Sequence, residues 1–187
     1  MRKLTPQELS LQRPSPAEVR NRPRKPIYAL ADNVRSMHNV GALFRTADGA
    51  GLAKLFLCGI SACPPRPEIR KTSLGAEEVV EWEYFPSAVQ AVAALKAQGV
   101  HIVVLEHTDC SYDFRLAPYR FPLCLVVGHE QHGVSEEVIA LADIAVEIPM
   151  AGVKESLNVS VAFGIAVYEI VRHYDAQQGQ PVAPLGD

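Results

Sequence analysis

Three short segments of the chain place charged, amide and hydroxyl side chains between apolar stretches. The first, NVGALFRTA at residues 39–47, contains Asn39 and Arg45 and is predicted to be an otherwise apolar helix. A buried or half-buried guanidinium needs an anionic partner, such as an RNA phosphate; a surface arginine in a salt bridge is the alternative. Because six residues turn a helix by about 600°, the two side chains diverge by roughly 120° and share a site only if Asn39 lies at the helix start.

The second segment, GHEQHGVS at residues 128–135, brings His129, Glu130 and His132 close enough to suggest a metal site. Zinc-binding helices of this kind need histidines four residues apart on a continuous helix, whereas this spacing is shorter and glycines flank the group. We therefore expect no metal here. The segment is better interpreted as a loop at the carboxyl end of a parallel strand, where α/β folds bind ligands and where Gly128 would allow close approach to the backbone.

The third segment, IPMAGVKESLNVS at residues 148–160, joins a predicted strand to a long predicted helix. Ser156 and Asn158 are residue types that favour helix starts, so N-capping is one interpretation. Capping explains one of them but not the whole group of small and polar residues. Backbone N–H groups at such a helix start could instead hold a cofactor or a polar substrate group.

The elements that would position these segments begin at residue 27. Apolar periodicity predicts strands at 27–32, 54–59, 79–85, 101–106, 123–127 and 144–148, and helices at 39–50, 86–98, 135–141 and 156–175. Continuous apolar strands that alternate with helices predict an α/β fold with a mostly parallel sheet flanked by helices. The motifs GxxxxGK[ST] and GxGxxG are absent, which argues against a P-loop NTPase or an ordinary dinucleotide-binding domain.

Charge is distributed unevenly along the 187 residues. Residues 1–26 carry seven Lys or Arg against two Glu, a net charge of +5, so that the remaining residues carry −8. A basic, proline-rich arm on an acidic body suggests contact with a polyanion, although a solvated leader fits equally well. We expect one domain at 27–175 and a flexible tail at 176–187. No apolar run suits a membrane span or a signal peptide, which predicts a cytoplasmic protein.

Together, the three segments resemble the sequence motifs of the SpoU (TrmH-like) branch of the SPOUT RNA methyltransferases. The motifs are NVGALFRTA at 39–47, LVVGHEQHGVS at 125–135 and IPMAGVKESLNVS at 148–160, and KTSLGAE at 71–77 is also similar to the family. The resemblance covers about residues 27–174. One such motif would be weak, whereas three in the right order and spacing are specific. Many members have asparagine, serine or alanine in place of His129, a departure that bears on specificity.

This resemblance implies a fold, a cofactor and an assembly. The α/β domain would contain a deep trefoil knot near its C-terminus, whose loops would hold S-adenosylmethionine (SAM). The protein would be a homodimer in which each active site draws on both subunits. The cofactor would contact five positions, largely through the backbone: Glu106, Gly128, Ile148, Met150 and Leu157. Arg45 would be the catalytic arginine, and four further residues would shape the site: Asn39, Glu130, Ser156 and Asn158.

The implied reaction transfers a methyl group to a ribose 2′-hydroxyl of RNA, which requires in-line positioning and removal of a weakly acidic proton. Because arginine is effectively always protonated, we expect Arg45 to pair with the neighbouring phosphate and to stabilise the developing alkoxide rather than to act as the base. The short ends resemble tRNA-modifying members more than those with an added RNA-binding domain. A non-catalytic RNA-binding protein and a small-molecule α/β enzyme are the alternatives.

Overall fold

The computed structural model describes residues 1–12 and 14–179, and within them one sheet has seven strands that all pair in parallel. The strand order is β3-β2-β1-β6-β4-β7-β5. The strands are β1 (Lys25–Asp32), β2 (Leu52–Cys58), β3 (Glu81–Phe85), β4 (His101–Leu105), β5 (Tyr112–Asp113), β6 (Leu123–Val127) and β7 (Ile144–Glu147). The mostly parallel α/β fold predicted from the sequence is confirmed.

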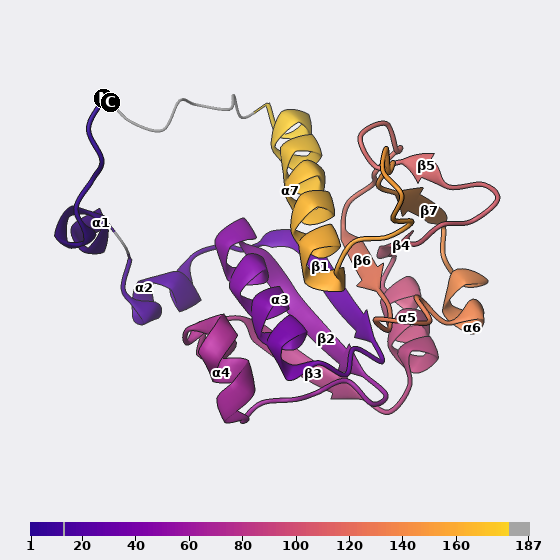
Figure 1. Ribbon diagram of the computed structural model, residues 1–187, viewed down its shortest axis with the longest axis horizontal. Helices are drawn as coiled ribbons and strands as arrows, with labels where there is room; N and C mark the ends of the chain where they lie inside the picture. The colour runs from indigo at the N-terminus through magenta and orange to yellow at the C-terminus, as the bar shows by residue number, and fades with distance from the viewer. Residues whose placement is uncertain (13, 180–187) are drawn as a thin grey trace.

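Helices cover both faces of this sheet (Figure 1). They are α1 (Pro6–Gln12), α2 (Pro16–Asn21), α3 (Met37–Ala50), α4 (Pro67–Ser73), the 3-10 helix η1 (Ala76–Glu78), α5 (Ala88–Ala97), α6 (Glu136–Ile139) and α7 (Val159–Gln177). Residues of α3, α4 and α7 form one core with the sheet, and residues of α5 and α6 form a second core on the opposite face. The continuous apolar character of the central strands follows from this arrangement, because both faces of these strands are covered, whereas the edge strand β3 is largely exposed.

Side chains alternate between the two cores along the central strands. On β6, Leu123 and Leu125 face the α3 side, whereas Cys124 and Val126 face the α5 side. All four side chains are fully buried. At one edge of the sheet, the three motif segments follow β1, β6 and β7: the first lies in helix α3, the second in the loop after β6, and the third in the loop that leads into α7.

Two parts of the prediction were wrong or incomplete. The last helix begins at Val159 rather than at Ser156, because Asn158 caps it and residues 149–157 form a loop. Helix α4 and strand β5 were not predicted. Helix α4 is short and polar, and the buried Ile69 is its only large aliphatic side chain, so its sequence has too little periodicity to indicate a helix.

The basic arm contains the two short helices α1 and α2, which the sequence did not predict. Arg20 donates a hydrogen bond to the carbonyl of Glu78 in η1 at 3.0 Å, and Lys25 pairs with Asp175 of α7. The predicted flexible tail overlaps the end of α7, and its residues 180–187 lie outside the described part of the chain. No helix in the described residues is long and apolar enough to cross a membrane.

Candidate active site

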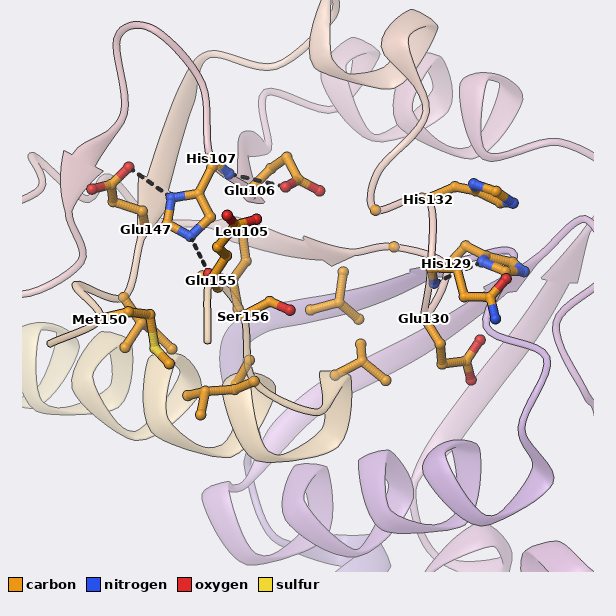
Figure 2. Close-up of a pocket in the computed structure, with 18 residues that line it drawn as sticks. Leu105, Glu106, His107, His129, Glu130, His132, Glu147, Met150, Glu155 and Ser156 are labelled. Atoms are coloured by element: carbon orange, nitrogen blue, oxygen red, sulfur yellow. Dashed lines mark hydrogen bonds and ion pairs between the residues drawn. The ribbon is translucent and has the colours of Figure 1, made fainter. Parts of the chain in front are cut away.

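A pocket of about 300 Å³ lies where the ends of β4, β6 and β7 meet the loop before α7 (Figure 2). All five residues expected to contact the cofactor line this pocket: Glu106, Gly128, Ile148, Met150 and Leu157. Glu130 and Ser156, expected to shape the site, also line it. The structure thus brings the second and third motif segments together around one cavity.

Gly128 occupies a position in which no side chain fits. A Cβ atom there would lie 2.0 Å from the carbonyl carbon of Gly133 and 2.1 Å from the backbone nitrogen of Val134. The loop is this tight because His129 and Gly133 exchange two backbone hydrogen bonds of 2.9 Å. Glu106 anchors the end of this loop, since its Oε2 accepts the backbone N–H of Val134 at 2.9 Å. The backbone of this loop is therefore exposed to the pocket in a fixed shape.

The carboxylate of Glu130 links the second motif segment to the first. It accepts hydrogen bonds from the backbone N–H groups of Arg35 at 3.2 Å and Ser36 at 2.9 Å, and from Nδ2 of Asn39 at 2.9 Å. Partial burial opposes ionisation, but the bonds from Asn39 and the backbone outweigh it and lower the pKa of Glu130 below its ordinary value. Glu130 is therefore a carboxylate at neutral pH.

Asn158 brings the third segment into the same network. Its Nδ2 donates to Oδ1 of Asn39 at 3.1 Å, while its own Oδ1 accepts the backbone N–H of Ser160 at 2.9 Å at the start of α7. The capping interpretation is therefore correct for Asn158, and the same side chain also connects α7 to α3. Ser156 lies two residues earlier, in the exposed loop.

Arg45 does not occupy the half-buried position expected from its apolar surroundings. Its side chain is exposed, makes no hydrogen bond or ion pair within residues 1–12 and 14–179, and is not among the residues that line the pocket. The reason is geometric, because the apolar residues of α3 face the core from the other side of the helix: Val40, Leu43, Phe44 and Ala47. Asn39, in contrast, lies in the first turn of α3, which is the position that a site shared with Arg45 was expected to require.

The histidines of the second segment do not surround a common centre. The rings of His129 and His132 stack with centroids 4.8 Å apart and an interplanar angle of 27°, while Glu130 turns toward Asn39. In the described part of the chain, no group of three His, Cys, Asp or Glu residues could hold a metal ion.

Two residues around the site were missed by sequence reasoning. Asp32 is buried at the end of β1 and accepts the backbone N–H of Ser135 at 2.9 Å, which anchors the end of the second motif segment. His107 follows β4 and contacts Glu147 and the backbone of Glu155 across the pocket. No local pattern could identify either residue, because their partners lie 40 to 103 residues away in the sequence.

The described residues that line the pocket combine negative charge with apolar surface. They include no Lys or Arg. They do include four glutamates, which are Glu106, Glu130, Glu147 and Glu155. Leu105, Val127 and Ile148 contribute apolar surface. Such a pocket favours a ligand that carries net positive charge and also has apolar surface to bury.

Comparison with known proteins agrees with this arrangement. The model of the SpoU rRNA Methylase family matches residues 26–168. The chain belongs to this family. One SpoU relative, the tRNA (guanosine(18)-2′-O)-methyltransferase of Aquifex aeolicus, is 38% identical over 83% of this chain and 73% of its own length. The resemblance to the family found in the sequence is thereby confirmed.

Two solved structures share the fold. The TrmH/SpoU tRNA modifying enzyme of A. aeolicus superposes with a TM-score of 0.77 at 34% identity, over 92% of this chain and 86% of that one. An AdoMet-bound rRNA methyltransferase of Sinorhizobium meliloti gives a TM-score of 0.75 at 32% identity over 87% of this chain. This chain spans 62% of the length of the S. meliloti methyltransferase.

Proposed function

We propose that this protein transfers a methyl group from SAM to a ribose 2′-hydroxyl of RNA, and that tRNA is its substrate in preference to rRNA. The observation that carries the proposal is the single pocket built from the second and third motif segments, which the Glu130–Asn39–Asn158 network joins to the first. Membership of the SpoU family and the name of the A. aeolicus relative support both the reaction and the choice of tRNA.

The pocket fits SAM in charge and in surface. SAM supplies an electrophilic methyl group on a sulfonium centre, and the whole molecule carries a net positive charge at neutral pH. Four carboxylates and no Lys or Arg among the described lining residues complement that charge. The thioether product, whose net charge is zero, would lose this attraction. Gly128 and Leu157 would contact the cofactor through the backbone, together with Glu106, Ile148 and Met150.

The residues of the first segment are assigned to the RNA. The exposed guanidinium of Arg45, which has no partner within the described residues, is available to pair with the phosphate beside the target ribose. From there it would orient the 2′-hydroxyl and stabilise the alkoxide as its proton leaves. Asn39, Glu130 and Asn158 hold α3 and α7 in register with the pocket, and Ser156 shapes its open side.

A homodimer is part of the proposal. Three large side chains on the outer face of α7 are exposed at spacings of four and three residues: Val161 (50%), Ile165 (40%) and Tyr168 (54%). A second copy would cover this apolar stripe. Since Arg45 does not line the pocket of its own protomer, a site shared between two subunits would bring it to the reacting groups. The family's trefoil knot would be formed by the segments around the pocket.

The remaining parts of the proposal concern the ends of the chain and its location. Residues 27–175 would form the methyltransferase domain, and the basic arm at 1–26 would neutralise RNA phosphates in the cytoplasm. Deletion of the arm is expected to weaken RNA binding and to reduce its dependence on salt, as measured by filter binding across a salt series. Unchanged affinity at low salt would contradict this role of the arm.

The direct test uses purified protein, SAM labelled in its methyl group, and unmodified tRNA or rRNA. The wild type should transfer label to tRNA, and Arg45→Ala should slow transfer by about a hundredfold or more while it still binds SAM. Arg66→Ala removes another exposed arginine, outside the site, and should retain activity. Wild-type rates for Arg45→Ala would refute its role. RNA binding without SAM binding would identify a non-catalytic protein, and no affinity for RNA would favour a small-molecule enzyme.

A further inference from the structure

The ring of His107 bridges two segments that border the pocket. Its Nδ1 lies 3.2 Å from Oε2 of Glu147 at the end of β7, and its Nε2 lies 3.1 Å from the backbone carbonyl oxygen of Glu155. Both contacts are drawn in Figure 2, where the ring stands between the end of β7 and the loop that leads to α7. His107 itself lies two residues after the end of β4, so one side chain joins three parts of the fold.

The 149–157 loop has little else to hold it. Residues 151–157 are all exposed, and Val153 is 99% exposed. Within residues 1–12 and 14–179, the ring of His107 is the only hydrogen-bond partner of this loop. Segments with few hydrogen bonds and little buried surface open most easily.

The same loop supplies part of the pocket, because Met150, Ser156 and Leu157 all line it. A loop that is already in its bound position loses less conformational freedom when a ligand binds. We propose that His107 is a positioning residue that holds the 149–157 loop in the SAM-binding position through the carbonyl of Glu155. This inference rests on the proposed function, since it takes SAM as the ligand of the pocket.

Both partners of the ring are acceptors, so the ring contributes a donor at each contact that it makes. A proton on Nε2 alone is enough to donate to the carbonyl oxygen of Glu155 and so to hold the loop.

The test compares His107→Leu with the wild type in two measurements that need no RNA. Limited proteolysis by thermolysin, which cuts before apolar residues such as the exposed Val153, should cleave the 149–157 loop about tenfold faster in the variant when SAM is absent, because the loop loses its hydrogen bond to the ring. Calorimetric titration should give a SAM dissociation constant about tenfold higher than that of the wild type. In a methyl-transfer assay, KM for SAM should rise while kcat stays within about twofold.

Two further variants make the result specific. Glu155→Ala keeps the backbone carbonyl that His107 contacts and should leave the rate of loop cleavage unchanged, whereas His107→Gln keeps one donor and should lie between wild type and His107→Leu. If His107→Leu shows wild-type loop cleavage and wild-type SAM affinity, His107 does not hold the loop. If the wild type fails to bind SAM at all, the proposed function is wrong, while loop cleavage still decides whether His107 holds the loop.

Discussion

The two walls of the pocket are built in opposite ways. The 128–135 loop is held at both ends, by the paired backbones of His129 and Gly133 and by the carboxylates of Glu106 and Asp32. The 149–157 loop faces it across the cavity with exposed residues, and within the described residues a single side chain is its hydrogen-bond partner. One wall is fixed before a ligand arrives, and the other is free to move once its contact with His107 is broken.

This difference suggests that the two loops have different roles in ligand binding. The preformed 128–135 loop fixes the position of the ligand, because rigid backbone groups do not need to reorganise around it. A weakly held wall gives the ligand a way in and out, since loops that gate sites belong to the least stable parts of a fold. The rigid side also carries Glu130, whose network joins the pocket to α3 and α7.

The largest expected effect comes from adding one methyl group to each wall. Gly128→Ala would place its Cβ against backbone atoms about 2 Å away, so it should destabilise the protein by about 3 kcal/mol and abolish SAM binding. Gly152→Ala has nothing within 4 Å of its Cβ and should change stability by less than about 0.5 kcal/mol. Urea denaturation of both variants measures the contrast. Equal stabilities would mean that the two walls do not differ as described.

Glu130→Gln tests the hydrogen bonds that the carboxylate of Glu130 accepts from α3 and the residues before it. The variant should lower the free energy of unfolding by about 2 kcal/mol, because an amide nitrogen then faces backbone N–H donors. The lowered pKa of Glu130 sets the sign of the pH dependence. The carboxylate stabilises the fold fully above its ordinary pKa of 4.5, and this contribution is lost as the pH falls through the lower pKa of the folded state.

The stability difference between wild type and Glu130→Gln should therefore shrink below about pH 4.5. Glu137→Gln, an exposed carboxylate on α6, provides the matched control and should show no such change. A difference that stays constant from neutral to acid pH would show that Glu130 does not hold the network through its charge.

A smaller effect separates the two roles of Asn158. Asn158→Asp keeps the oxygen that caps α7 but loses the donor to Asn39, whereas Asn158→Ala loses both. The alanine variant should lower the free energy of unfolding by about 1 to 2 kcal/mol, and the aspartate variant should lower it by less than half of that, as measured by thermal unfolding. If the two variants are equally destabilised, the bond to Asn39 rather than the helix cap is the main contribution.

The sequence predicted the 128–135 loop better than it predicted the 149–157 loop on the other side of the pocket. Strand β6 has the bounds expected from its apolar run, and Gly128 was singled out from its place after that strand. The exposure of Arg45 and the bond between Asn39 and Asn158 depend on how α3 packs, which local periodicity does not contain. His107 gave no signal, because its role exists only when β4, β7 and the loop before α7 are brought together.

The most direct test of the account is mass spectrometry of nucleosides from tRNA that has been incubated with the protein and SAM carrying a trideuterated methyl group. The account predicts the deuterated methyl group on a ribose 2′-oxygen, and no transfer by Gly128→Ala. A deuterated methyl group on a base, or none in tRNA or rRNA with active wild-type protein, would contradict it.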